Sequence, residues 1–263
     1  MNKVKMTTLA LGNQTVQIDE GELVSYKVDG HEFIHQKGSP GWGSADTEMF
    51  PIIGPVAEAN FIVKTTRGGS VQDQHGHFRL LKYDLVLSSV RSAVFRKAYE
   101  AGTLVDNKKY PENSNKAQLS WPYSFKFEKA FELTDTGLEV RFTITGDEGM
   151  PFMLGYHPAF KLYTAAPTIH AHGPTITLDE VLAVGSRALE VPNCNKITLK
   201  DKKSITIAIE GFQHFMCWTE VRNMVCIEPI TFYPYAVEQQ DLHKGFQKLK
   251  GSATFKVSLS VSD

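Results

Sequence analysis

Residues 125–144 read FKFEKAFELTDTGLEVRFTI and contain two runs in which apolar and polar side chains alternate. In the first run the apolar positions are Phe125, Phe127, Phe131 and Leu133, and in the second they are Leu138, Val140, Phe142 and Ile144. A period of two is that of a β-strand with one buried face. The intervening TDTG, residues 134–137, is typical of a turn. The segment therefore predicts an antiparallel hairpin.

The same alternation returns further along the chain, in residues 205–209 and again in residues 255–261. We find no stretch of 12 residues with a convincing apolar stripe at helical spacing, so the crossover helices that a parallel sheet needs are missing. Antiparallel sheets with one wet face show this alternation. We therefore expect an all-β fold, a large antiparallel β-sandwich.

The size and charge of the chain limit its organisation and its partners. A length of 263 residues is within the range of one large β domain, so we expect a single domain over residues 1–263. The net charge is −1, which gives no field to hold a nucleic acid or an acidic membrane surface. A small neutral ligand suits this balance better, and we expect neither nucleic-acid nor membrane partners.

The cysteines and the N-terminus favour a cytoplasmic location. The chain has an odd number of cysteines, namely Cys194, Cys217 and Cys226, which argues against a disulfide framework and for a reducing compartment. Residues 1–12 lack the apolar core of a signal peptide, and no run of 18 apolar residues occurs. Residues 99–120 are polar and rich in turn formers, and we expect a long surface connection there that overhangs a functional site.

Three short segments concentrate groups that can do chemistry: QHGHFR at 74–79, GYHPAF at 155–160 and CIEP at 226–229. Glu228 follows an apolar run, where a carboxylate is costly to desolvate unless a partner or a reaction uses it. Taken singly, each histidine is more often a hydrogen-bonded structural residue than a catalyst. For Glu228 alone, a buried ion pair is about as expected as catalysis.

A metal site is the alternative for the first segment. His75 and His77 are two residues apart, and on a strand both side chains would face the same side, as in a metal-binding cupin. Such a site needs further ligands, and no glutamate follows His77 before Glu100. We therefore expect no metal.

Together these segments resemble the aldose 1-epimerase family, in particular its branch of shorter bacterial chains. Residues 50–54, FPIIG, follow Trp42 as in that branch, and His75-Gly76 with Phe78 and Arg79 is similar to its HGFAR stretch, with His77 interposed. Residues 155–160 resemble its GxHPAF motif, and residues 227–229 its IEP motif, with Trp218 upstream. The order and spacing of the motifs are more specific than any one of them. The fold implied is the galactose mutarotase-like β-supersandwich.

The resemblance implies a mutarotase that interconverts the α and β anomers of an aldohexose. Glu228 matches the family's general base, His157 its general acid, and His75 a second histidine near the ring oxygen. Ring opening needs a proton removed from the anomeric hydroxyl and another donated to the ring oxygen, which a carboxylate facing an imidazolium can do. The reaction needs no cofactor, and the expected partner is a monosaccharide.

Sugar binding also needs flat apolar surfaces and polar groups around the hydroxyls. The aromatic candidates are Trp42, Phe50, Phe78, Trp121 and Trp218, of which Trp42, Phe50 and Trp218 are our expected contacts, and Arg79 is the expected cation. Each aromatic alone is more often a core residue.

The chain departs from the family where Pro55 replaces an arginine that follows FPIIG, so one donor is lost. The sequence does not single out the aspartate that binds sugar hydroxyls in many relatives. Two alternatives therefore stay open: a carbohydrate-binding or sensing module without turnover, and a hexose-6-phosphate 1-epimerase, which would need a basic cluster for the phosphate.

Overall fold

The structure is a computed structural model that describes residues 6–262, and it contains the expected hairpin. Strands β12 (Phe125–Thr134) and β13 (Gly137–Gly146) pair antiparallel from Phe125 opposite Gly146 to Thr134 opposite Gly137. The alternating side chains follow the predicted faces, since Phe127 and Phe131 are buried while Lys126 and Glu132 are exposed. The turn lies between Thr134 and Gly137, as predicted.

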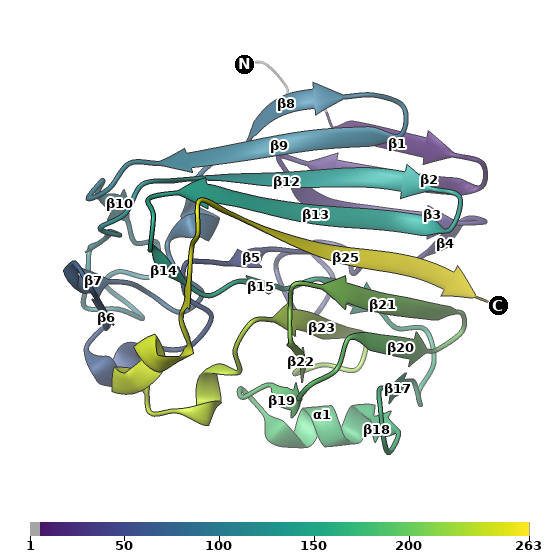
Figure 1. Ribbon diagram of the computed structural model, residues 1–263. Helices are drawn as coiled ribbons and strands as arrows, with labels where there is room; N and C mark the ends of the chain where they lie inside the picture. Colours follow the sequence, from purple (N-terminus) through teal and green to yellow (C-terminus); the bar gives the residue numbers. More distant parts are fainter. Residues whose placement is uncertain (1–5, 263) are drawn as a thin grey trace.

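This hairpin is at the centre of a nine-stranded sheet, in which the order is β18-β17-β20-β21-β25-β13-β12-β9-β8. Figure 1 shows it from β8 at the top to β18 at the bottom. The strands other than the hairpin are β8 (Asp84–Ser88), β9 (Ser92–Tyr99), β17 (Thr168–His170), β18 (Ile176–Thr177), β20 (Lys196–Lys200), β21 (Ser204–Glu210) and β25 (Ser252–Ser262). Strands β21 and β25 confirm the two other alternating stretches. All pairings are antiparallel.

A second sheet carries the segments in which the chemical groups are concentrated. Its order is β19-β22-β23-β15-β5, and β16 also pairs with β23. The strands are β5 (Glu48–Met49), β15 (Gly155–Tyr156), β16 (Ala159–Lys161), β19 (Leu189–Val191), β22 (His214–Trp218) and β23 (Met224–Ile230). A four-stranded sheet of β1 (Thr7–Leu11), β2 (Gln14–Asp19), β3 (Glu22–Val28) and β4 (His31–Glu32) lies beside them.

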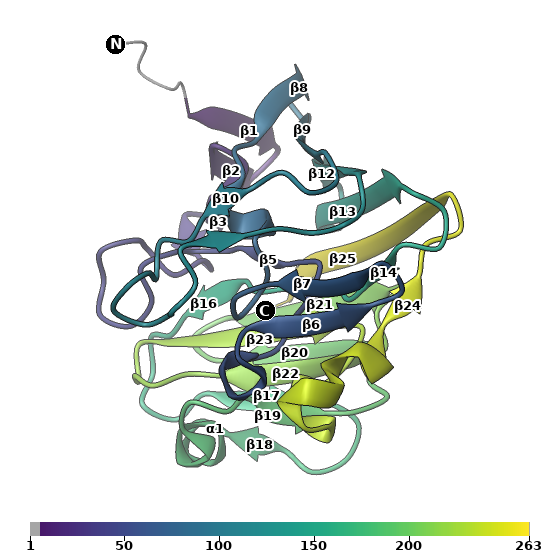
Figure 2. The ribbon, with the colours of Figure 1, turned by 90° about the vertical axis from the view of Figure 1, so that its left-hand side faces the viewer.

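The remaining elements are short. There are three two-stranded sheets: β6 (Ile62–Thr65) with β7 (Gly68–Val71), β10 (Val105–Asp106) with β11 (Gln118–Leu119), and β14 (Pro151–Phe152) with β24 (Gln247–Lys248). The helical pieces are α1 (Leu178–Val184), η1 (Ala57–Ala59), η2 (Phe78–Leu80), η3 (Pro234–Ala236) and η4 (Gln239–Gly245). Figure 2 shows the β6–β7 hairpin beside the yellow segment that contains η4. The all-β antiparallel prediction is confirmed.

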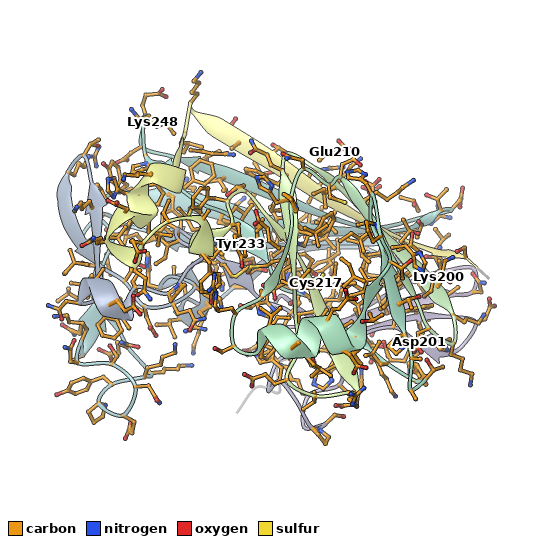
Figure 3. The ribbon with its side chains drawn as sticks, turned by 90° about the horizontal axis from the view of Figure 1, so that it is seen from below. Lys200, Asp201, Glu210, Cys217, Tyr233 and Lys248 are labelled. Atoms are coloured by element: carbon orange, nitrogen blue, oxygen red, sulfur yellow. The ribbon has the colours of Figure 1, made fainter. Side chains whose placement is uncertain are left out.

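Apolar side chains of the large sheets fill the space between them. Figure 3, seen from below, places Cys217 inside this packed interior, while Lys248 lies at its margin. The largest buried side chains include Trp121, Phe127, Phe142 and Tyr156. Within residues 6–262, the structure holds no helix with the length and apolar character needed to cross a membrane.

Candidate active site

Strand register in the second sheet brings Glu228 and His157 together from segments 71 positions apart. Glu228 lies on β23 opposite Met216 of β22, and Ala159 of β16 pairs with Cys226 on the other side of β23. His157 lies between β15 and β16, where its N–H and C=O exchange hydrogen bonds with Thr47. As a result, His157 Nε2 lies 3.4 Å from Glu228 Oε1.

The pair opens into a cavity of about 260 Å³. Six of the seven predicted site residues line this cavity: Trp42, His75, Arg79, His157, Trp218 and Glu228. The structure thus brings together three segments that are far apart in sequence. Gln74, Glu220 and Tyr235 also line it, and the sequence motifs did not identify them. Glu220 and Tyr235 lie within two and seven residues of the predicted Trp218 and Glu228, but no pattern in the sequence singles them out.

His75 enters the cavity because the chain makes a left-handed turn at this point. His75 and Gly76 have φ of 70° and 72°, a region that only glycine adopts freely. A Cβ on Gly76 would be 2.1 Å from the carbonyl oxygen of Phe50, so the turn can approach residues 50–51 only with glycine there. Phe50 N–H donates to the His75 carbonyl, and Phe78 N–H donates to the Phe50 carbonyl. These bonds join the two predicted motifs.

A backbone hydrogen bond fixes the tautomer of His75. Its Nδ1–H donates to the carbonyl of Ile53 at 2.7 Å, so Nε2 carries the free lone pair in the neutral ring. Burial, followed by the electrostatic influence of His157 and Arg79, holds the His75 pKa well below its ordinary value. The ring is therefore neutral and can accept a hydrogen bond through Nε2.

Burial disfavours a charge on either member of the His157–Glu228 pair. It raises the pKa of Glu228 well above its ordinary value, and it lowers the pKa of His157 to about 3, with Arg79 acting in the same direction. The free site therefore favours a protonated carboxyl beside a neutral imidazole, and not the carboxylate and imidazolium expected from the sequence. Both arrangements contain one proton and differ only in which side chain holds it.

Two tryptophans frame the imidazole of His157. The ring of Trp42 lies 4.3 Å from it, centroid to centroid, and that of Trp218 lies 5.9 Å away with an edge-on orientation. Both indoles are partly exposed and line the cavity, as expected for side chains that contact the C–H faces of a sugar.

Phe50 was expected to contact the sugar, and the structure places it in the core instead. Its side chain is fully buried, packs edge-on against Phe78 and Phe125, and does not line the cavity. The two weaker aromatic candidates, Phe78 and Trp121, are also fully buried. The FPIIG segment therefore positions His75 through its backbone, while the phenylalanine ring anchors it to the core.

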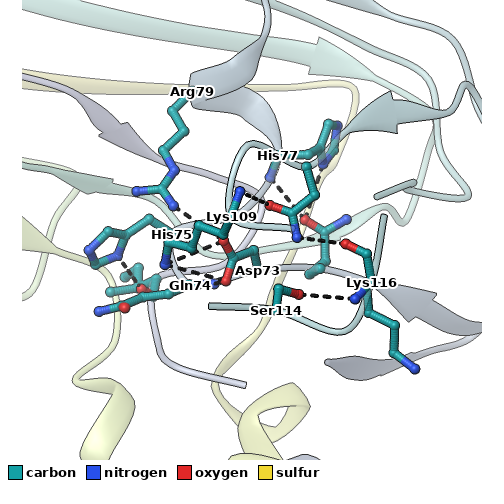
Figure 4. A network of polar contacts seen from close by, with 11 residues as sticks. Asp73, Gln74, His75, His77, Arg79, Lys109, Ser114 and Lys116 are labelled. Atoms are coloured by element: carbon teal, nitrogen blue, oxygen red, sulfur yellow. Dashed lines mark hydrogen bonds and ion pairs between the residues drawn. The ribbon is translucent and has the colours of Figure 1, made fainter. Parts of the chain in front are cut away.

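A basic cluster adjoins the cavity, centred on Asp73. Figure 4 shows Arg79 and Lys109 converging on this buried carboxylate, at 3.5 and 3.3 Å. A second hollow of about 260 Å³ is lined by Arg79, Lys108 and Lys109, and it shares Trp42 and Arg79 with the first cavity. Lys108 and Lys109 come from the polar connection at residues 99–120, which does approach the site as expected.

The paired-histidine metal site is not formed. His77 is fully buried and points away from His75, with its Nδ1–H donating to Gln72 Oε1 at 3.1 Å and its ring 4.5 Å from that of Tyr99. The prediction that both rings would share one side assumed a strand. The left-handed turn at His75 and Gly76 breaks that alternation.

A buried ionic network supports strand β15, which directly precedes His157. Tyr156, the preceding residue, donates its hydroxyl to Asp46 Oδ2 at 2.7 Å. Lys129 Nζ lies 2.7 Å from Asp46 Oδ2 and 2.6 Å from Glu48 Oε1. Burial lowers the pKa of Lys129, but the two carboxylates outweigh it, and the net shift is upward. The network therefore ties β12 of the nine-stranded sheet to β5 and β15 of the second.

The comparisons with known proteins agree with this geometry. The model of the aldose 1-epimerase family matches residues 21–236. The chain belongs to the aldose 1-epimerase family. No sequence among the curated proteins matches the chain.

Among the solved structures, a galactose mutarotase-like protein from Lactobacillus casei is similar in fold to this family member. It has a TM-score of 0.80 at 20% identity, covering 98% of this chain and 100% of that one. A galactose mutarotase related enzyme from Lactobacillus acidophilus has a TM-score of 0.78 at 21% identity, with the same coverage. A GalM/aldose epimerase homologue from C. elegans has a TM-score of 0.68 at 10% identity, covering 98% of each chain.

In this member of the family, Pro55 lines the cavity at the position where the sequence lacks the expected arginine. Arg79 lines the same cavity, and its guanidinium is held by Asp73. Arg79 is therefore in a position to supply a donor that Pro55 does not.

Proposed function

We propose that this protein is an aldose 1-epimerase that interconverts the anomers of an aldohexose by ring opening. The observation that carries the proposal is the contact of His157 and Glu228 in a cavity lined by indoles and Arg79. The anomeric hydroxyl and the ring oxygen are bonded to the same carbon. A base and an acid that serve both must therefore lie side by side, as these two groups do.

In the forward direction, the carboxylate of Glu228 takes the proton of the anomeric hydroxyl while His157 gives one to the ring oxygen. The ring opens to the aldehyde, rotation about one bond exposes its other face, and reclosure reverses both transfers. The pair holds one proton before and after the cycle, but burial favours the neutral arrangement, so the proton must first pass from Glu228 to His157 to give the reactive carboxylate and imidazolium. His75 accepts a hydrogen bond from a sugar hydroxyl through Nε2, and each positioned acid or base contributes about 10²- to 10⁴-fold.

Polarimetry on freshly dissolved α-glucose or α-galactose tests the proposal. We expect the protein to accelerate the approach to the equilibrium rotation. Equal rates with and without protein would reject the enzyme. If calorimetry then detected sugar binding without acceleration, the binding or sensing module would replace it.

The basic cluster favours a second candidate, a hexose 6-phosphate as the substrate. The hollow beside the cavity has an excess of two positive charges, because three cations, Arg79, Lys108 and Lys109, line it together with one carboxylate, that of Asp73. A phosphate on the sugar would pair with them. In this case glucose 6-phosphate should be the better substrate, and Lys109→Met should lower its kcat/KM by about tenfold or more while leaving that of glucose unchanged.

A further inference from the structure

Cys226 places a thiol beside the acid/base pair, and the proposed chemistry does not use it. It lies two residues before Glu228 on β23, so both side chains project from the same face of the strand. A ring nitrogen of His157, Cys226 Sγ and a carboxylate oxygen of Glu228 all lie within 4.8 Å of one another. Three residue types that bind metals thus converge at one point.

Within the described residues, the carboxylate of Glu228 makes no hydrogen bond, although its Oε1 lies 3.4 Å from His157 Nε2. Both carboxylate oxygens of Glu228 and Nδ1 of His157 are buried without a hydrogen bond. The two residues are 1% and 6% exposed, and both line the cavity. Buried polar atoms without partners are uncommon, and a bound ion is one explanation for them.

The donor set fits zinc. Zn²⁺ binds nitrogen, sulfur and oxygen ligands at about 2.0–2.3 Å, which places tetrahedral ligands about 3.3–3.8 Å apart. The three atoms lie within 4.8 Å of one another, which exceeds this spacing by about 1 Å. A thiolate and a carboxylate together neutralise the ion, which suits a buried site, and the cavity leaves the fourth position open to water.

We propose that His157, Cys226 and Glu228 form a zinc site that competes with the sugar. On binding, the thiol of Cys226 loses its proton to solvent, the sulfur, nitrogen and carboxylate lone pairs coordinate the ion, and no group is oxidised or reduced. The bound ion occupies the lone pairs that the acid/base pair needs. The inhibitory effect rests on the proposed function, whereas the binding does not.

Cobalt provides a test that needs no variant. Adding Co²⁺ to the protein should give a thiolate-to-cobalt charge-transfer band in the near ultraviolet, and Zn²⁺ should abolish it at one equivalent. Absence of this band at saturating Co²⁺ would overturn the proposal, whether or not the protein accelerates mutarotation.

Cys226→Ser with Cys217→Ser as its control tests the ligand assignment. Cys217 is also buried, but it is on β22 and does not belong to the three-residue group. Cys226→Ser should abolish the cobalt band and weaken Zn²⁺ binding by at least about 100-fold in calorimetry, and Cys217→Ser should change neither. Equal zinc affinity in Cys226→Ser and the wild type would exclude Cys226 as a ligand and overturn the site.

The competition is then measured with sugar present. Zn²⁺ should raise the apparent KM for the sugar in the wild type, and Cys226→Ser should keep the uninhibited rate while losing this sensitivity. If the protein binds sugar without turnover, calorimetric displacement of sugar by Zn²⁺ replaces the rate. Zinc and sugar binding at the same time would contradict the competition.

Discussion

His77 illustrates how a single buried histidine makes a fold sensitive to acid. Its ring is fully buried, and burial lowers its pKa to about 3. The unfolded chain binds a proton near pH 6.5, so between pH 6.5 and 3 it binds more protons than the folded chain. The contribution of His77 to stability is therefore lost as the pH falls through this window, by up to about 5 kcal/mol.

We expect His77→Phe to flatten this acid dependence. The backbone N–H of residue 77 keeps its bond to Gln72, and an aromatic ring remains beside Tyr99. Urea unfolding at pH 7 and pH 4 should show a smaller loss of free energy of unfolding in the variant than in the wild type. His172→Gln, at an exposed position, is the control and should keep the wild-type slope. An unchanged slope in His77→Phe would show that His77 is not a source of the acid sensitivity.

The sequence predicts some site residues but does not decide which aromatic side chains lie at the cavity and which lie in the core. The motifs predicted Glu228, His157 and His75 as site residues, and these residues do line one cavity, because a carboxylate after an apolar run and histidines beside glycine or proline stand out in sequence. Phe50 and Trp42 are both large aromatics near the same motif, yet one is in the core and the other at the cavity. Only the backbone path decides between them. Asp73 was missed, although it directly precedes the predicted segment, because its role depends on Lys109, which is 36 residues away.

At the scale of elements, the turn at residues 75–76 depends on close contact with the β5 segment. We predict that Gly76→Ala destabilises the fold by at least about 1–3 kcal/mol and lowers activity, because its Cβ would collide with the Phe50 carbonyl and displace His75. Thermal unfolding and polarimetry measure the two effects.

Gly102→Ala separates the collision from the backbone strain. Gly102 has φ of 79°, close to that of Gly76, but a Cβ added there would meet no atom within 4 Å. In this variant the free energy of unfolding should fall by only about 1 kcal/mol, the cost of the left-handed conformation, and activity should be retained. Equal losses in the two variants would contradict the role assigned to the contact with Phe50.

At the scale of the whole molecule, Lys129 joins the two large sheets. Its side chain faces inward between Phe127 and Phe131, where it meets Asp46 and Glu48. The alternation in residues 125–133 already places Lys129 on the apolar face, so its burial could have been predicted from the sequence. Its partners could not, because they depend on how the sheets pack.

Lys129→Met should lower the free energy of unfolding by about 3–5 kcal/mol, since it leaves two buried carboxylates without their cation. Arg96→Met removes a positive charge from the exposed pair with Glu128 on the same sheet and should cost less than about 1 kcal/mol. Chemical denaturation compares the two. A loss in Lys129→Met no greater than that in Arg96→Met would exclude the network as a link between the sheets.

The proposed function requires that Glu228 and His157 move protons to and from the sugar. The mutarotation rate of Glu228→Gln tests this requirement most directly. Glutamine keeps the shape of the side chain but cannot take a proton, so polarimetry with α-glucose should show a loss of at least about 100-fold relative to the wild type. Glu132→Gln, at an exposed position on β12, should retain the wild-type rate. A folded Glu228→Gln protein with the wild-type rate would contradict the account.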